Sequence, residues 1–218
     1  MTATVVGLKN VCFQLCKATK KGYDNLLIIA DHCFKHGIKV VSAFVFSTEN
    51  WRRSRTEVSY LMKLLKQALV NETAKLADKD IQLRISGTHT GMSKKMLILI
   101  NDAQEKTKHC KKGILNLCLN YGGRTELKEV IKKIINDDLK ADEITEEKIN
   151  SYLWTSGLPD PDIIIRTSGE KRLSGFLPWQ SVYSELYFCK KMWPDFEIKD
   201  LDEILIDYGN RQRRFGGN

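Results

Sequence analysis

The sequence predicts one α/β domain with a mostly parallel central sheet and helices on both of its faces. Short apolar, β-branched runs alternate along the chain with longer segments whose apolar residues recur every three or four positions. Strands that are separated by helices in this way form parallel sheets. The length of 218 residues suits a single hydrophobic core, and the sequence contains no internal repeat or low-complexity segment. We therefore treat residues 1–218 as one domain.

The first elements show the alternation clearly. A helix is predicted over 24–36, where apolar residues share one face and Gly37 ends the pattern. The run IKVVSAFVF (38–46) predicts a strand that is covered on both faces. The string SRTE, which begins at Ser54, is a capping box that opens a long amphipathic helix over 57–78.

The same pattern continues to the end of the chain. Further strands are predicted at 81–86, 113–121, 162–166 and 185–189, and further helices at 92–108, 125–138, 145–153 and 198–212.

Composition and charge indicate an ordinary globular protein with a basic surface. Apolar residues make up 42% of the chain, and no apolar run approaches the roughly 20 residues of a membrane span. The first residues lack the basic region of a signal peptide, so we expect a cytoplasmic protein. The net charge of +8 is spread over separate lysine pairs without interleaved aromatic residues, which predicts no nucleic-acid partner. Peripheral contact with an anionic membrane, the endoplasmic reticulum in a eukaryote, and binding of small anions stay open as alternatives.

Cysteine and histidine do not point to a metal site. The six cysteines form no CxxC pair, and most lie in apolar segments, as free thiols do in reducing compartments. His32 and His36 have the spacing of a helical zinc site, but Cys33 stands where that motif needs a glutamate. A helix end near Gly37 is the simpler explanation of these two histidines.

Polar side chains that suit a polyanion follow three of the predicted strands, in the strings FSTENWRR, NYGGR and RTSGEKRLS. Parallel strands bring their carboxyl ends to one edge of the sheet, where ligands bind. Guanidinium groups and hydroxyls bind phosphates well, and the glycines at 122, 123 and 169 would let backbone approach a ligand. Each string alone also fits a plain turn, but together they predict a diphosphate site formed by Ser47, Asn50, Arg53, Arg124, Arg166, Arg172 and Ser174.

Glu185 follows this cluster along the chain and has two interpretations. It is a salt-bridge partner of the arginines, or it holds Mg²⁺ on the diphosphate, because hard cations take carboxylate and phosphate oxygens.

Several strings together resemble the cis-prenyltransferases, the family of the undecaprenyl and dehydrodolichyl diphosphate synthases. They follow the family's order and spacing over about residues 20–217, and they are FSTENW, LNYGGR, LPDPDIIIRTSGEKRLSGFLPWQ, YSELYF, WPDF and RQRRFGG. The resemblance implies the fold of that family and its Mg²⁺-dependent reaction. An allylic diphosphate such as farnesyl diphosphate would be elongated with isopentenyl diphosphate. The product would be a polyprenyl diphosphate for lipid carriers of the dolichol or undecaprenol type.

The resemblance also implies roles for single residues. The isopentenyl diphosphate would be held by Arg166, Arg172 and Ser174, and Mg²⁺ placed with the help of Glu185. The loop that joins the two substrate sites would contain Ser47, Asn50, Trp51 and Arg53, with Asn50 and Trp51 supporting catalysis. A C-terminal segment with Arg214 and Gly216 would reach across a dimer to the neighbour's diphosphate. The helices predicted at 24–36 and 57–78 would wall an apolar tunnel for the growing chain.

One family motif is absent. Family members carry, ahead of the first helix, a strand that ends in a motif like Asp-Gly-Asn-Gly-Arg-Trp, whose aspartate serves catalysis and Mg²⁺ handling. Counted back without gaps, the motif should begin at Met1, and the family's histidine before the helix is replaced by Thr19. We therefore expect that the strand is lost, and that TVVGLKNVCF must cover the sheet edge left open.

Three interpretations follow from this absence. The chain is a synthase with a truncated or misassembled N-terminus, and is impaired as it stands. Alternatively, it is a non-catalytic subunit beside an active paralogue, which would make the dimer heteromeric. A third interpretation is a diphosphate-binding protein without prenyl chemistry.

Overall fold

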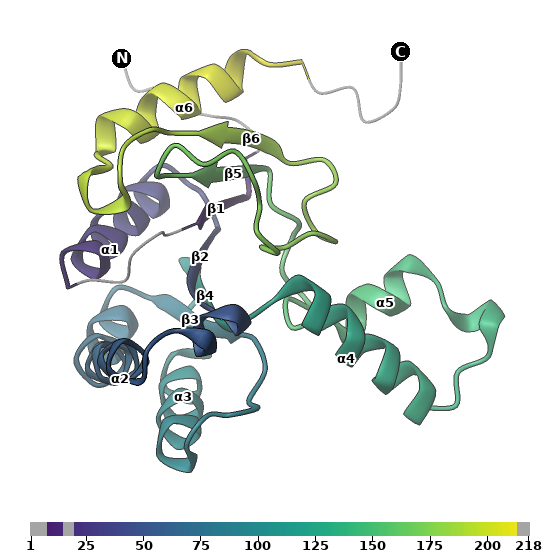
Figure 1. Cartoon of the computed structure of the whole chain (residues 1–218). Helices are drawn as coiled ribbons and strands as arrows, with labels where there is room; N and C mark the ends of the chain where they lie inside the picture. Colours follow the sequence, from purple (N-terminus) through teal and green to yellow (C-terminus); the bar gives the residue numbers. More distant parts are fainter. Residues whose placement is uncertain (1–7, 15–19, 213–218) are drawn as a thin grey trace.

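The computed structural model describes residues 8–14 and 20–212 and has a six-stranded sheet at its centre (Figure 1). The strand order is β3-β4-β2-β1-β5-β6, and all neighbouring strands are parallel, which confirms the predicted fold class. The strands are β1 (Asn10–Gln14), β2 (Val40–Ser47), β3 (Ile81–Ser86), β4 (Gly113–Tyr121), β5 (Ile163–Arg166) and β6 (Glu185–Phe188). The helices are α1 (Lys20–Lys35), α2 (Arg55–Asp78), α3 (Lys94–Thr107), α4 (Gly123–Asn136), α5 (Glu146–Tyr152) and α6 (Ile198–Asn210), with short 3₁₀ turns η1 (Thr48–Arg52), η2 (Ala141–Glu143) and η3 (Trp193–Asp195).

Strand β1 corrects the expectation that the strand ahead of the first helix is lost. It lies in the middle of the sheet, between β2 and β5, and all five of its residues are buried. Its polar ends are tied down, since Asn10 Nδ2 donates to Pro159 O at 2.8 Å and Gln14 Nε2 donates to Leu173 O at 2.6 Å. The start of the chain therefore supplies the central strand, and does not cover an open edge.

The two faces of the sheet are covered differently. Phe13 and its alternating neighbours face the main core, into which α1, α2, α3 and α6 pack their apolar sides. Cys12 and Ile164 point to the opposite face, where they meet Phe176 and Trp154. On that second face, loop residues stand where helices were expected.

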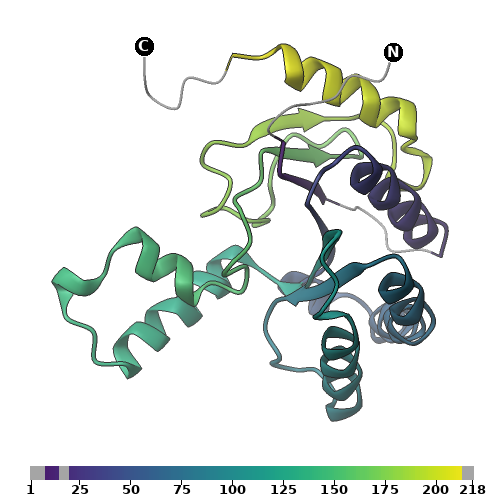
Figure 2. The same cartoon turned by 180° about the vertical axis from the view of Figure 1, so that it is seen from behind.

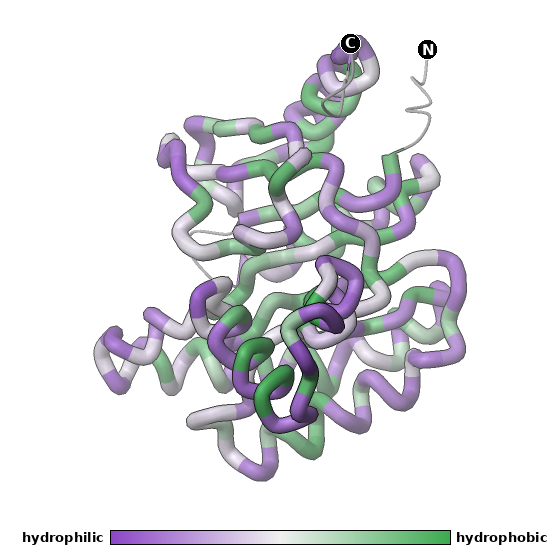
Figure 3. Tube along the Cα trace, turned by 90° about the vertical axis from the view of Figure 1, so that its right-hand side faces the viewer, coloured by the Kyte–Doolittle hydropathy of each residue, from purple (hydrophilic) through white to green (hydrophobic). Residues whose placement is uncertain are grey.

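Helices α4 and α5 form an arm that projects from the rest of the molecule (Figures 1 and 2). Its small core joins Val130 and Ile134 of α4 with Leu153, and Trp179 packs against them. Trp179 Nε1 also donates to Asn150 Oδ1 at 2.7 Å. Seen from the side of the arm, hydrophobic and hydrophilic residues alternate along the helices, as amphipathic packing requires (Figure 3).

Side-chain contacts explain the helix ends. Ser54 caps α2 by accepting a hydrogen bond from Glu57 N, while the Glu57 carboxylate pairs with Arg53 at 2.6 Å and leaves the capping box half formed. His32 Nε2 lies 2.7 Å from Asp202 and joins α1 to α6, and His36 Nδ1 bonds the His32 carbonyl, so the pair serves the helix end.

Cys12 lies in the core and has the properties of a structural thiol. Burial raises the pKa of the Cys12 thiol to about 12, as expected of an inert thiol in a core. Among the described residues, no helix combines the length and the apolar character that crossing a bilayer requires.

We predict that Phe13→Ala lowers the free energy of unfolding by about 3–5 kcal/mol, because it leaves a cavity in the main core. The Phe13 ring packs against both Trp193 and Phe196, whose centroids are 5.3 and 6.1 Å away. Urea unfolding followed by circular dichroism measures the loss. Tyr60→Ala, at an exposed position on α2, is the control and should cost less than about 0.5 kcal/mol. Equal losses in the two variants would show that β1 is not a core strand.

Candidate active site

A polar cavity of about 370 Å³ opens at the carboxyl ends of β1, β2 and β5. Three arginines and two glutamates line it, so its charge is net positive. Most residues that the sequence predicted for a diphosphate site meet here. These are Ser47, Asn50, Arg53, Arg166, Arg172 and Ser174.

Arg166 is the most constrained of the three arginines. It is the last residue of β5 and only 8% exposed, and its Nε has no hydrogen-bond partner among the described residues. Arg53 and Arg172 are more exposed and pair with Glu57 and Glu170. A buried guanidinium nitrogen without a partner is costly, and an anion in the cavity would satisfy it.

The η1 turn after β2 is held by side-chain amides. Ser47 N donates to Asn50 Oδ1 at 2.9 Å. Trp51 Nε1 donates to Asn120 Oδ1 at 2.7 Å, and Asn120 Nδ2 donates to the carbonyls of Thr88 and Thr90, each at 2.8 Å. Asn50 therefore shapes the turn itself, and Asn120 fastens Trp51 to the loop that follows β3.

The glycines of the NYGGR string serve packing between loops, which differs from the expected contact with ligand. A Cβ on Gly122 would lie 2.3 Å from Thr48 Oγ1, and one on Gly123 would lie 2.2 Å from Pro178 Cδ. Gly123 N also donates to Gly175 O at 2.9 Å. The backbone N–H of Gly169 is likewise used, because it donates to Cys189 O at 2.9 Å. These positions hold the three strand ends together.

Two other predicted residues, Arg124 and Glu185, do not line the cavity. Arg124 is exposed in the first turn of α4. Glu185 begins β6 opposite Ile163, at the amino end of the sheet, and its carboxylate pairs with Arg211. Arg214 and Gly216 lie outside the described residues. The structure thus separates Glu185 from the arginines of this chain's cavity.

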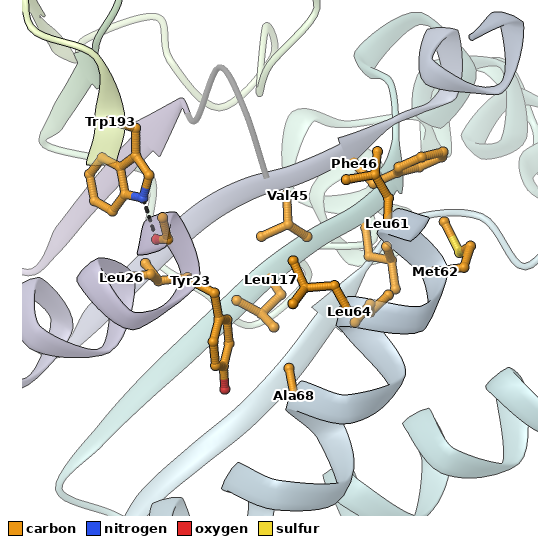
Figure 4. A pocket seen from close by; sticks show the side chains of 13 residues that line it. Tyr23, Leu26, Val45, Phe46, Leu61, Met62, Leu64, Ala68, Leu117 and Trp193 are labelled. Atoms are coloured by element: carbon orange, nitrogen blue, oxygen red, sulfur yellow. Dashed lines mark hydrogen bonds between the residues drawn. The ribbon is translucent and has the colours of Figure 1, made fainter. Parts of the chain in front are cut away.

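An apolar cavity of about 60 Å³ adjoins the polar one, between α1 and α2 (Figure 4). Tyr23 and Leu26 come from α1, and Leu61, Leu64 and Ala68 from α2. A tunnel for the growing chain along these two helices stays a prediction. Burial raises the pKa of the Tyr23 hydroxyl, in keeping with apolar surroundings.

The two cavities share Val45 and Phe46. The register between β2 and β4 shifts on either side of Phe46. Such an irregularity bends a strand and re-aims its side chains. Consecutive residues of β2 therefore border both the polar and the apolar space.

The polar cavity has carboxylates for a magnesium ion bound together with a diphosphate but, in the part of the chain that the structure describes, not the ligand set of a metal site formed by protein side chains alone. Among the described residues, no group of three or more His, Cys, Asp or Glu side chains is placed to hold a metal ion. Mg²⁺ on a diphosphate, however, keeps several waters and needs only one or two carboxylates. Glu49 and Glu170 line the cavity and could supply them.

The sequence-based prediction missed four polar residues of the cavity, which are Gln14, Glu49, Ser168 and Glu170. Ser168 and Glu170 lie inside the quoted string RTSGEKRLS. Gln14 could have been noticed as the polar residue that ends the run VCF.

Comparisons with known proteins identify the family. The prenyltransferase family described as "Putative undecaprenyl diphosphate synthase" matches residues 13–216. The chain belongs to this family. It is 46% identical to an isoprenyl transferase from Thermotoga maritima, over 92% of this chain and 87% of that protein. It is 42% identical to one from Clostridium perfringens, over 91% of this chain and 80% of that protein.

Solved structures of the family have the same fold. A probable undecaprenyl diphosphate synthase from Campylobacter jejuni superposes with a TM-score of 0.86 at 31% identity, covering 96% of this chain and 98% of that one. Lavandulyl diphosphate synthase from Lavandula x intermedia, in complex with dimethylallyl diphosphate, gives 0.89 at 29% identity, covering 95% and 98%.

Membership makes this chain an enzyme of the prenyl-transferring class, whose reaction is cis-prenyl chain elongation. The family match begins at Phe13, inside β1. The strand ahead of α1, after which the resemblance predicts the aspartate motif, is β1, so the gapless count that placed the motif at Met1 was wrong. The residues that follow β1 in the sequence are 15–19. They read Leu-Cys-Lys-Ala-Thr and include neither aspartate nor glycine. The motif is thus absent after β1, and its absence does not come with loss of the strand.

Proposed function

We propose that this cis-prenyltransferase binds isopentenyl diphosphate in the polar cavity and adds it to an allylic diphosphate, giving a polyprenyl diphosphate. The observation that carries the proposal is the junction of the two cavities at Val45 and Phe46. A diphosphate and an apolar chain need such contrasting surroundings side by side. A diphosphate-binding protein without prenyl chemistry would have no use for the apolar cavity.

The residues of the cavity divide the work. Arg166, Arg172 and Ser174 hold the diphosphate of isopentenyl diphosphate, with Arg166 fixed by burial and Arg172 free to leave Glu170 for the ligand. Asn50 and Arg53 lie at the turn that borders both cavities, where the two substrates would meet. Trp51, held by Asn120, fixes the position of that turn.

The reaction forms one carbon–carbon bond. The alkene of isopentenyl diphosphate attacks the allylic carbon, the diphosphate leaves from that carbon, and loss of a proton creates the new cis double bond. Mg²⁺, when bound, supplies positive charge to the leaving diphosphate. Charges fixed where negative charge develops on the leaving allylic diphosphate lower the barrier. Arg166 and Arg172 hold the diphosphate that does not leave, and so position the attacking alkene.

The allylic half of the site is where this chain departs from its family. Residues 15–19 replace the loop that supplies an aspartate and several backbone donors. We propose that the chain alone elongates slowly or not at all. The absence of the aspartate motif from residues 15–19 also favours a second candidate function, that of a non-catalytic subunit beside an active paralogue. The retained cavity for isopentenyl diphosphate argues against it.

We also propose a dimer, with either a second copy or a paralogue. Strand β6 is at the edge of the sheet, and it exposes Leu186 and Phe188. Val182, Tyr183 and Ile206 add exposed apolar surface from the same part of the chain and from α6. An exposed apolar edge strand is an association surface. Undecaprenol- or dolichol-type products would bring such a dimer to a membrane surface.

Substitution of Arg172 tests the diphosphate site. Arg172→Ala should weaken isopentenyl diphosphate binding by about 2 kcal/mol or more, since hydrogen bonds to charged groups contribute roughly 1.5–3 kcal/mol each. Arg172→Lys should also weaken it, because the planar fork is lost. Calorimetric titration measures both, with Lys111→Ala at the other edge of the sheet as the charge-matched control. Unchanged affinity in both arginine variants would remove the assignment.

Deletion of residues 213–218, which include Arg214 and Gly216, tests the dimer. The unfolding temperature should stay the same, because the deletion leaves Arg211 paired with Glu185. Affinity for isopentenyl diphosphate should fall, since the neighbour's tail would no longer reach the site. Light scattering and titration provide the measurements. A full-length chain that is monomeric and binds as tightly as its deletion variant would contradict the proposal.

The loop after β1 can be tested by restoring it. The unmodified chain should incorporate labelled isopentenyl diphosphate into farnesyl diphosphate far more slowly than a variant whose residues 15–19 are replaced by a loop beginning Asp-Gly-Asn-Gly-Arg-Trp. Loss of one preorganised donor can cost roughly 10²–10³ in rate, and several are missing here. Both chains are assayed with Mg²⁺. Robust turnover by the unmodified chain would mean that another carboxylate, such as Glu49 or Glu170 of the cavity, does the work of the aspartate.

A further inference from the structure

Asn120, near the end of β4, joins two loops that leave the same edge of the sheet. It is 1% exposed, and its φ of 53° is a left-handed conformation that asparagine adopts more readily than most residues. Its Oδ1 accepts a hydrogen bond from Trp51 Nε1 at 2.7 Å, and its Nδ2 donates to Thr88 O and Thr90 O, each at 2.8 Å. Both N–H groups and the oxygen of this amide are therefore in use.

The three partners require an amide at this position. An indole N–H only donates and a carbonyl only accepts, so residue 120 must present one acceptor and two donors on a short side chain. A carboxylate offers acceptors alone, and a hydroxyl has a single donor. The backbone adds to the contact, since Thr88 N donates to Asn120 O at 3.2 Å and a Cβ on Gly87 would lie 1.8 Å from Leu119 O. The loop after β3 is thus packed directly on the end of β4.

Trp51 extends this arrangement to the junction of the two cavities. Its ring meets that of Phe46 edge to face, with centroids 5.2 Å apart and planes at 74°, and Phe46 lines both cavities. A Cβ on Gly91, in the loop after β3, would lie 3.8 Å from the other ring of the indole. Because Trp51 is 37% exposed, burial alone does not fix its position, and the hydrogen bond to Asn120 is needed as well.

We propose that Asn120 is a positioning residue for the hydrocarbon part of the substrate. By holding Trp51 and the loop after β3 in one arrangement, it keeps Phe46 in place where the polar and apolar cavities meet. The inference rests on the proposed function and deepens it, because it assigns to a buried residue outside both cavities an effect on one part of the ligand. The diphosphate is not affected, since the residues proposed to hold it come from β5 and the loop after it.

Hydrogen exchange of the full chain tests the link between the loops. Asn120→Gly removes the amide without a change of charge, and glycine accepts the left-handed backbone. Exchange of backbone amides should become about tenfold faster in both 48–53 and 87–92, because the hydrogen bonds that join these segments are lost, and should stay the same in β1. Unchanged exchange in either segment, or an equal increase in β1, would overturn the inference.

Calorimetric titration then compares isopentenyl diphosphate with inorganic diphosphate, both with Mg²⁺. The ratio of the two affinities measures what the hydrocarbon adds to binding, and binding stoichiometry reports the folded fraction. Asn120→Gly should lower this ratio roughly four- to fifteenfold, as for one or two methylene groups that lose their contacts, and leave the affinity for inorganic diphosphate unchanged. A role in folding alone would leave the ratio as it is, and that result would overturn the inference.

Two further variants complete the test. Thr90→Ala is the matched control, because it keeps the carbonyl that Asn120 binds, and it should change neither exchange nor the ratio. Trp51→Phe keeps an aromatic ring beside Phe46 but cannot donate to Asn120, so it should lower the ratio even where Asn120→Gly folds poorly. An unmodified chain that binds neither ligand would overturn the proposed function together with this inference, whereas binding with an unchanged ratio in both variants would overturn the inference alone.

Discussion

The burial of β1 between β2 and β5 is the constraint on which the rest of the structure depends. Without this five-residue strand, the sheet would separate into β3-β4-β2 on one side and β5-β6 on the other. Parallel pairing on both sides fixes the register, so that Gln14 lies across from Phe44 and from Arg166. The carboxyl ends of β1, β2 and β5 therefore lie next to one another at the same edge of the sheet, and their side chains line one cavity.

Close backbone contacts then hold the loops that leave this edge. Gly122 and Gly123 let the end of β4 approach Thr48 on one side and Pro178 on the other, at distances that no side chain would allow. Asn120 joins Trp51 to the loop after β3. Arg53 and Arg172 thus project from loops that are packed against one another, and Arg166 from the end of β5, which limits the reorganisation that binding would require.

Much of this arrangement could be predicted from the sequence. The alternating apolar residues of β3 and the nearly continuous apolar run of β4 gave the bounds of both strands to the residue, and polar strings mark the strand ends. β1 could not, since five residues with polar ends show no periodicity. The glycines were assigned to ligand contact because a close approach to another loop looks the same in a sequence. The position of Glu185 away from the cavity could have been predicted from the sequence. Glu185 is the first residue of a parallel strand, and such a residue lies at the edge of the sheet opposite the carboxyl ends that form the site.

The unsatisfied atoms at the cavity follow from the same constraint. Folding alone would not favour a buried Gln14 oxygen beside a buried Arg166 nitrogen, each without a partner. The register of β1 and β5 brings them together, and packing on both faces of the sheet stabilises the strands enough to keep them there. Among the described residues, no side chain or backbone group satisfies these two atoms. The irregular end of β2 places the apolar cavity next to that polar surface, because Val45 and Phe46 line both. This is the contrast that the proposed diphosphate substrate with its hydrocarbon chain requires.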